Sequence, residues 1–315
     1  MMGESASSVF PTPPLCILGP TASGKSSLAL EIASKIEGVE LVSIDSMQVY
    51  RGMDIGTAKP TAAEQESVVH HLIDIADPAD DFAVSSFQQA WRDVAADMAS
   101  RGAIPVLVGG TGLYLRAVID DFAFPGQFPE VVEELEQQEL SNAELFRRLE
   151  ELDPLAASRI DSNNERRLIR ALEVTIGSGQ PFSSFGPGMT DYPETSFSLL
   201  GLRMGKELVI NRINARYEQQ MIDGFLPEVE ALLARERPIG RTARQALGYR
   251  ELLSHLEDGV ALDDALETAR VRTRRFARRQ MKWFERDPRI NWVQLGDGES
   301  SVAALDHALS LMRVQ

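Results

Sequence analysis

Short apolar runs alternate with amphipathic helical patterns over the first third of the chain. Three runs are rich in strand-favouring residues: LCILG (15–19), LVSID (41–45) and IPVLVGG (104–110). Between them, apolar residues in 26–36 and 84–100 recur every three or four positions, which predicts helices with one buried face. Strands that alternate with helices form βαβ units around a parallel sheet. We therefore expect a doubly wound α/β core.

The pattern changes after this region. No strand pattern occurs between residues 120 and 194, where acidic amphipathic helices are predicted at 130–140, 142–153 and 166–176. A loop rich in Gly, Pro and Ser follows at 177–188. We predict that residues 120–194 form a mostly helical inserted domain.

The strand pattern returns at residues 197–204. Further helical patterns lie at 206–224, 228–237 and 261–286, and the run WVQL at 292–295 indicates a last strand. Residues 1–119 and 195–315 are therefore expected to form one core around the insertion.

Composition places the chain among globular proteins. Its 43% of hydrophobic residues is sufficient for a packed core, and its one cysteine, Cys16, lies in an apolar run and is expected to be a core residue. A single cysteine excludes an internal disulfide and suits a reducing compartment. The first 15 residues lack the features of a secretory signal, and no run of about 18 apolar residues could cross a membrane. We expect a cytoplasmic protein, without membrane association, that acts as a monomer.

The positive charge is concentrated in one helix. The net charge of −15 argues against a nucleic-acid partner, yet residues 270–289 contain nine basic and two acidic residues. A helical projection separates two faces. One face is apolar and comprises Phe276, Ala277, Met281, Trp283 and Phe284; the other is basic and comprises Arg270, Arg274, Arg278, Lys282 and Arg286. We favour contact with RNA phosphates over a solvated basic face.

A phosphate-binding loop joins the first predicted strand to the first predicted helix. The segment GPTASGKS at 19–26 fits the pattern G-x-x-x-x-G-K-[ST]. Its members are Gly19, Pro20, Thr21, Ala22, Ser23, Gly24, Lys25 and Ser26. Glycines allow backbone N–H groups to surround an anion, while Lys25 and Ser26 can reach phosphates and a Mg²⁺ ion.

The acidic residue of a nucleotide hydrolase is missing from its usual place. A hydrolase adds a strand that ends in Asp, but the strand at 104–108 runs into Gly109, Gly110 and Thr111. The nearest acid at a strand end is Asp45, which should face the same crevice as the loop. Asp45 could bind Mg²⁺, accept a proton from an acceptor substrate, or stabilise a turn. We therefore expect the bound phosphate to be a group by which the substrate is held, or a leaving group, and not the phosphate of a nucleotide that is hydrolysed.

Seven segments together resemble the bacterial tRNA dimethylallyltransferases, also called tRNA isopentenyltransferases. They are GPTASGKS (19–26), DSMQVYRGMDIGTAKP (45–60), HHLIDI (70–75), VLVGGTGLY (106–114), RRLIRALEV (166–174), ARQALGYRE (243–251) and TRRFARRQMKWFERDPRI (273–290). The resemblance covers nearly the whole chain. The second segment is the most specific, because other phosphate-loop enzymes do not share it.

The resemblance implies a core like that of small nucleotide kinases and a reaction that transfers carbon. A dimethylallyl group would move from dimethylallyl diphosphate to the exocyclic amine of the adenosine just 3′ of the tRNA anticodon, with Mg²⁺. The family assigns the general base to the aspartate of its D-S-x-Q motif, here Asp45. Thr21, Lys25 and the loop would stabilise the departing diphosphate. Arg212 and Arg216 match a family R-x-x-x-R spacing near the diphosphate, and the sequence leaves open which of them touches it.

The resemblance also implies a set of RNA contacts. Ser46, Met47, Gln48 and Thr111 would touch the target base or its neighbours. Arg166, Arg167 and Arg170 of the insertion, together with Arg244, Gln245, Gly248, Tyr249 and Arg250, would grip the RNA. The family often has Gln where this chain has Arg166, so the insertion's contacts can differ in detail.

Three other functions use some of these features. A small-molecule kinase would need the same loop but would transfer phosphate from ATP. An adenylate isopentenyltransferase would act on free AMP and would not need a basic helix or an inserted domain. A non-catalytic RNA-binding module would leave Asp45 and the glycine loop unexplained.

Overall fold

The computed structural model describes residues 10, 12–122, 124–185, 191–296 and 302–312. The chain divides into two compact units: unit 1 is Met1–Asp121 with Glu194–Gln315, and unit 2 is Phe122–Pro193. These limits lie close to the predicted division at 119/120 and 194/195. In unit 1 the two connections are near each other, because the Thr195 hydroxyl donates to the Ile119 carbonyl at 3.3 Å.

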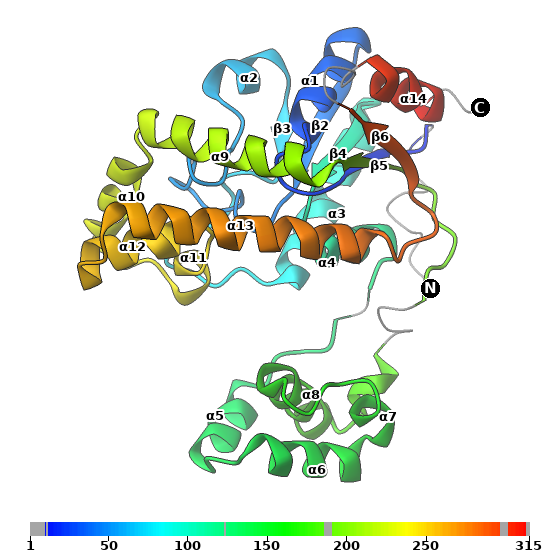
Figure 1. Ribbon diagram of the computed structural model, residues 1–315. Helices are drawn as coiled ribbons and strands as arrows, with labels where there is room; N and C mark the ends of the chain where they lie inside the picture. The colour runs from blue at the N-terminus through cyan, green and yellow to red at the C-terminus, as the bar shows by residue number, and fades with distance from the viewer. Residues whose placement is uncertain (1–9, 11, 123, 186–190, 297–301, 313–315) are drawn as a thin grey trace. The chain divides into compact units, whose positions relative to one another are not determined.

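Unit 1 is built on a parallel sheet, as the sequence predicts, and the sheet has six strands (Figure 1). The strand order is β3-β2-β4-β1-β5-β6. The strands are β1 (Leu15–Leu18), β2 (Val39–Ile44), β3 (His70–His71), β4 (Ile104–Gly109), β5 (Ser198–Met204) and β6 (Asn291–Leu295). From β1 the chain goes first to the β4 side and later to the β5 side, so the crevice for a ligand is expected at the carboxyl end of β1.

Helices cover both faces of the sheet because strand residues alternate between them. Leu15 and Ile17 of β1 join a core with α1 (Lys25–Lys35) and α14 (Val302–Met312). Cys16 and Leu18 point into the larger core on the other face. The helices of that face are α3 (Val84–Arg101), α4 (Gly112–Ile119), α9 (Lys206–Ile222), α10 (Phe225–Leu233), α12 (Tyr249–Asp258) and α13 (Leu262–Phe284). The expectation that Cys16 is a core residue is therefore confirmed.

Unit 2 is helical and has a core of its own. Its elements are α5 (Pro129–Gln137), α6 (Asn142–Leu152), α7 (Pro154–Ala157), α8 (Glu165–Ser178) and the 3₁₀ turn η1 (Phe182–Ser184). Leu149 and Leu172 are fully buried between these helices. The buried Asp153 caps α7 at the Ala156 N–H and also accepts from both the N–H and the hydroxyl of Ser183 at 2.7 Å, which fixes η1 against α7.

The expected elements occur within a few residues of their predicted ends, and several short ones were not predicted. Those are α2 (Ala62–Ser67), β3, α4, α7, α11 (Arg241–Arg244), α12 and α14. Parts of the predicted N-terminal tail and of the loop at 177–188 fall outside the described residues. In the described part of the chain, no helix has both the length and the apolar character that a membrane crossing needs.

Candidate active site

A cavity of about 400 Å³ opens at the carboxyl edge of the sheet in unit 1. The glycine loop after β1, Asp45 after β2 and the Gly109–Gly110 pair at the end of β4 all contribute to its wall. Arg212 and Arg216 of α9 line it as well. The phosphate loop and the carboxylate at the tip of β2 therefore face a common space, which is the arrangement that the sequence predicted.

The glycine loop contains three residues with positive φ, of which Gly19 has φ 148°. Gly24 has φ 89° and immediately precedes α1, and Ala22 has φ 64°. Gly24 is suited to its position because L side chains rarely adopt that conformation. Lys25 begins α1 and its Nζ donates to the Pro20 carbonyl at 2.7 Å, which closes the loop on itself. Ser26 follows in the same turn, exposed in the wall of the cavity.

Burial lowers the pKa of Lys25 to about 8. The nearby Asp45 carboxylate raises this pKa and the Arg216 guanidinium lowers it, but both effects are smaller than that of burial. A bound anion would favour the charged ammonium. Lys25 is therefore a cation whose charge depends on what the cavity contains.

Both arginines of α9 reach the glycine loop. Arg216 Nη1 donates to the Thr21 hydroxyl at 2.8 Å, whereas Arg212 Nη1 lies 3.5 Å from the Ala22 carbonyl. Burial lowers the pKa of Arg216, and its Nε is buried without a hydrogen-bond partner among the described residues. Neither arginine forms an ion pair with a carboxylate of the described chain. This end of the cavity is thus prepared for an anion.

Asp45 occupies a tight turn after β2. Its Oδ1 accepts from the N–H groups of Met47 at 2.8 Å and Gln48 at 3.3 Å, so the turn that the sequence allowed is present. Oδ2 makes no hydrogen bond to any described residue. The adjacent Ser46 N–H donates to the Thr111 hydroxyl at 3.2 Å, which connects the turn to the end of β4. The turn therefore orients the carboxylate and leaves one oxygen available.

The Gln48 amide is held on both sides. Its Oε1 accepts from the Ser43 hydroxyl at 2.7 Å, and its Nε2 donates to the carbonyls of Thr57 at 3.2 Å and Ala58 at 3.0 Å. Its orientation thus depends on the segment 53–60, which was not recognised as a support from the sequence.

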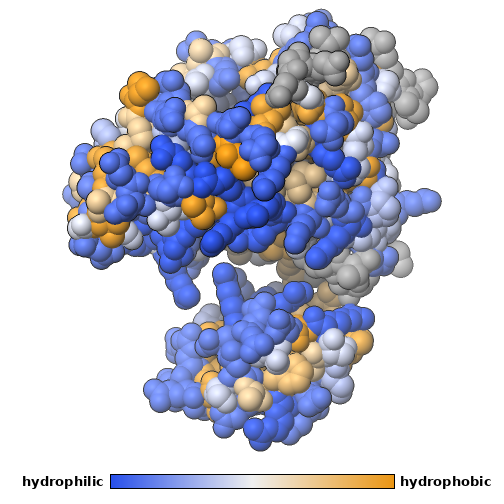
Figure 2. Space-filling model, viewed as in Figure 1, coloured by the Kyte–Doolittle hydropathy of each residue, from blue (hydrophilic) through white to orange (hydrophobic). Residues whose placement is uncertain are grey.

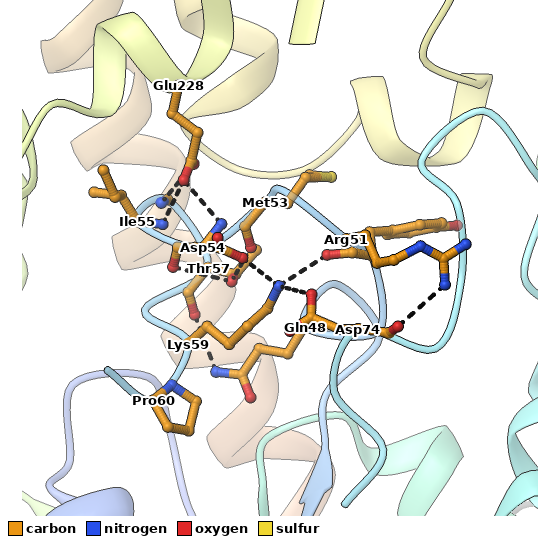
Figure 3. A network of polar contacts seen from close by, with 12 residues as sticks. Gln48, Arg51, Met53, Asp54, Ile55, Thr57, Lys59, Pro60, Asp74 and Glu228 are labelled. Atoms are coloured by element: carbon orange, nitrogen blue, oxygen red, sulfur yellow. Dashed lines mark hydrogen bonds and ion pairs between the residues drawn. The ribbon is translucent and has the colours of Figure 1, made fainter. Parts of the chain in front are cut away.

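Glu228 of α10 anchors the segment 53–60 (Figure 3). Its carboxylate accepts from three successive N–H groups, those of Asp54 at 2.9 Å, Ile55 at 2.7 Å and Gly56 at 3.2 Å. Gly56 has no room for a side chain, because a Cβ there would lie 2.3 Å from the Phe225 ring. The segment is therefore packed and hydrogen-bonded from the same side.

Lys59 anchors the same segment from within (Figure 3). Its buried ammonium donates to the Tyr50 carbonyl at 2.9 Å and to the carboxylates of Asp54 at 2.5 Å and Asp74 at 2.6 Å. Two carboxylates and a carbonyl satisfy all three protons of the ammonium. Lys59 thus fixes the segment that carries the Gln48 partners.

Two residues that were predicted to contact RNA, Tyr249 and Gly248, are buried in this structure. Tyr249 is fully buried, its hydroxyl donates to Glu228, and burial raises its pKa. Gly248 is also buried, with φ 86° at the start of α12. Tyr249 therefore supports the segment 53–60 through its hydrogen bond to Glu228. The nearby Gln245 and Arg250 are exposed and share a hydrogen bond, and Arg244 is paired with Glu257.

The basic helix is α13, and Figure 2 shows hydrophilic side chains gathered over it. Arg278, Lys282 and Arg286 are exposed, as predicted, whereas Arg270 and Arg274 are half-buried and paired with Glu267. Arg274 also donates to Asn214. The projection placed Phe276 among packed residues, but it is only half-buried and lines the cavity.

In unit 2, the three predicted arginines lie on α8. Arg166 and Arg167 are exposed. Arg170 donates to the Pro125 carbonyl at 3.0 Å and pairs with Glu173 at 2.7 Å. Glu173 also accepts from the Phe128 N–H, so Arg170 has a structural task within unit 2.

Gln280 of α13 is a cavity residue that the sequence reasoning missed. Its buried amide contacts the Thr21 N–H and the Gly110 carbonyl. A polar residue on the apolar side of an amphipathic helix was the available signal. Among described residues, no three His, Cys, Asp or Glu side chains lie close enough together to hold a metal ion, and His71 pairs with Glu40.

Comparison with known proteins agrees with this site. The family model described as IPP transferase matches residues 48–287. A tRNA dimethylallyltransferase of Bifidobacterium longum is 48% identical over 88% of this chain and 85% of its own. Another protein of that name, from Carboxydothermus hydrogenoformans, is 44% identical over 90% of this chain and 92% of its own.

Solved structures show the same relationship. A full-length tRNA isopentenylpyrophosphate transferase from Bacillus halodurans has a TM-score of 0.69 and 36% identity, with 95% of each chain covered. A eukaryotic dimethylallyltransferase acting on tRNA has a TM-score of 0.75 and 25% identity over 94% of this chain and 76% of its own. The phosphate loop, the carboxylate turn and these matches together place the chain in the IPP transferase family.

Proposed function

We propose that this protein transfers a dimethylallyl group from dimethylallyl diphosphate to the exocyclic amine of the adenosine just 3′ of the tRNA anticodon, releasing diphosphate. The observation that carries the proposal is that Asp45 and the cationic glycine loop line one cavity. Relatives named tRNA dimethylallyltransferase support the same reaction. In it, the allylic C–O bond breaks, a C–N bond forms, and the amine loses one proton.

The donor end supplies charge stabilisation. Negative charge grows on the diphosphate as the C–O bond breaks, and Lys25, Arg212, Arg216 and the loop N–H groups surround the space where it would lie. Such groups are most effective when they are fixed in place and shielded from water. Arg216 also holds Thr21, so both the arginine and the loop hydroxyl are positioned before the donor arrives.

The acceptor end supplies a base. An adenine exocyclic amine is a weak nucleophile because its lone pair is delocalised into the ring, so removal of its proton during attack lowers the barrier. Asp45 Oδ2 is the oxygen available to accept that proton, since Oδ1 is held by the Met47 and Gln48 N–H groups. Met47 and Gln48 flank it for contact with the splayed base.

The residues present suit Mg²⁺ better than a transition metal. The cavity offers the Ser26 hydroxyl, which is a hard oxygen donor. Mg²⁺ takes few ligands from protein and keeps substrate phosphates and water for the rest, which fits a site with so few carboxylates. When bound, the ion would neutralise diphosphate charge. Ser26 would hold it, and Asp45 is reserved for the proton.

Exposed cations of both units would hold the RNA. On unit 1 these are Arg278 and Lys282 of α13 with Arg250, whose hydrogen-bond partner Gln245 is also exposed; on unit 2 they are Arg166 and Arg167. Arg244, Arg274 and Arg170 could join them only by giving up carboxylate partners. Contacts of this kind position a nucleic acid through its phosphates without reading its sequence.

One labelling experiment tests the proposal against its alternatives. Radiolabelled dimethylallyl diphosphate is supplied with an anticodon stem-loop or with AMP, in parallel with labelled ATP and both acceptors. We expect label from the allyl donor only in the stem-loop. Label in AMP would instead identify an adenylate isopentenyltransferase, and phosphate transfer from ATP would identify a kinase.

A further inference from the structure

The side chain of Gln280 bridges two elements that meet at the cavity. Its Oε1 accepts from the Thr21 N–H at 2.8 Å, and its Nε2 donates to the Gly110 carbonyl at 2.9 Å. Gln280 lies on α13 at about 7% exposure, so water does not compete strongly for these bonds. The helix with the exposed basic face therefore also contacts the phosphate loop.

The two bonds require an amide in one orientation. One end of the side chain must accept from an N–H group and the other must donate to a carbonyl, which only a primary amide of this length does at any pH. A methionine of similar size makes neither bond. A glutamate can accept from Thr21, but when ionised it presents an acceptor to the Gly110 carbonyl.

The backbone at Gly110 is shaped to receive this amide. A Cβ at Gly110 would lie 2.2 Å from Gln280 Nε2 and 3.4 Å from the Gly19 carbonyl oxygen. No larger residue fits there unless the Gln280 side chain moves. The glycine loop, the end of β4 and α13 are thus in contact at a single point.

Gln280 stands between the two ends of the cavity. On one side it holds Thr21, whose hydroxyl accepts from Arg216. On the other side Gly110 adjoins Thr111, whose hydroxyl accepts from the Ser46 N–H beside Asp45. A displacement of Gln280 would therefore be felt by the loop that binds the diphosphate and by the segment that supports the carboxylate turn.

We propose that Gln280 is a positioning residue that fixes the Thr21 end of the phosphate loop against the end of β4. It thereby holds the diphosphate site at the distance and orientation from Asp45 that transfer requires. The proposal rests on the proposed function. It adds a residue that acts through Thr21 and Gly110.

The test compares Gln280→Met and Gln280→Glu with a matched control, Gln88→Met. Gln88 of α3 is also buried, at about 5% exposure, and its Nε2 donates to the Ala117 carbonyl at 2.8 Å, away from the cavity. We expect Gln280→Met to lower kcat about tenfold, the scale of a lost buried hydrogen bond with an unsatisfied partner, and to weaken diphosphate binding measured by calorimetry. The KM for the stem-loop should change less than twofold.

The glutamate variant separates positioning from bulk packing. A protonated carboxyl can donate to the Gly110 carbonyl, so the loss in Gln280→Glu, relative to the wild type at the same pH, should shrink as pH falls. The loss in Gln280→Met should stay constant. Lys25, Asp45, Arg212 and Arg216 line the same cavity, so each variant is compared with the wild type as a ratio at the same pH.

Three results would overturn the proposal. They are a Gln280→Met kcat equal to that of Gln88→Met at equal folded fraction, unchanged diphosphate affinity, and parallel pH profiles for the two Gln280 variants. Failure of the proposed function looks different, because the wild type itself would then not label the stem-loop. The diphosphate titrations would still compare the diphosphate affinity of the wild type with that of the Gln280 variants.

Discussion

The two ends of the cavity differ in how far their polar groups are satisfied without a ligand. At the donor end, Lys25, Arg212 and Arg216 form no close ion pair with a carboxylate of the described chain, and burial lowers the pKa of both Lys25 and Arg216. At the acceptor end, Gln48 and the Asp45 Oδ1 are already hydrogen-bonded by their own chain.

This difference indicates two kinds of preorganisation. The donor end is electrostatically incomplete, so an anion completes it and its affinity should respond to charge and pH. The acceptor end is geometrically complete, and it leaves one carboxylate oxygen for chemistry. Changes at the acceptor end should therefore alter rate or folding more than donor affinity.

The largest effect is expected for Asp45→Asn. The amide keeps the shape of the turn but cannot accept the proton, so we expect transfer to fall by about 10² or more, the usual size of a general-base contribution. Stem-loop affinity, measured by fluorescence anisotropy, should remain. Turnover at the wild-type rate would remove Asp45 from the mechanism.

Glu228→Gln tests whether the acceptor end depends on its distant support. The neutral amide is a weaker hydrogen-bond acceptor than the carboxylate for the N–H groups of Asp54, Ile55 and Gly56. We therefore expect the free energy of unfolding to drop by about 1–3 kcal/mol. Denaturant unfolding measures this, with the exposed Glu230→Gln as a control. Equal midpoints for the two variants would show that the carboxylate does not hold the segment.

The pH dependence of diphosphate binding tests the donor end. Lys25 has a lowered pKa of about 8, so above this pH the empty site loses the charge of Lys25 and binding must take up a proton. We expect Kd to rise by up to about tenfold per pH unit above pH 8. The titration of diphosphate itself is shared with Lys25→Met, so the ratio of the two Kd values isolates Lys25. A constant ratio from pH 7 to 9 contradicts the assignment.

The smallest effect is expected on the RNA surface. Neutralising the exposed pair Arg278 and Lys282 with glutamine should reduce the slope of log K against log salt by about 1.5, because two phosphate contacts are lost. Arg237, which is exposed but pairs with Asp80, provides the control. An unaltered slope in the double variant would show that the basic face of α13 is a solvated surface that does not contact RNA phosphates.

The sequence predicted the parallel core, the phosphate loop and the place of Asp45 because all three depend on local patterns. A strand, a glycine loop and a helix follow one another directly, and Asp45 closes its own strand. The short apolar helix α4 was missed, since eight residues without clear periodicity do not distinguish a helix from a strand.

The supports of the acceptor end depend on contacts between distant positions. Glu228 lies more than 170 residues from the N–H groups that it holds, and Gln280 lies 259 residues from Thr21. No periodicity or motif encodes such pairs. Tyr249 shows the same limit, because its burial against Phe225, with ring centroids 4.9 Å apart, follows from tertiary packing. Oligomeric state and cellular compartment stay predictions.

The bond between Thr195 and Ile119 shows how unit 2 is joined to unit 1 along the chain. It brings the two cut ends of unit 1 to within one hydrogen bond of each other, and unit 2 has its own hydrophobic core. A short turn could therefore close unit 1 where 72 residues, Phe122–Pro193, now depart and return. Unit 2 therefore leaves and rejoins unit 1 at nearly one point, and a circular arrangement of unit 1 around that point needs no other break in its chain.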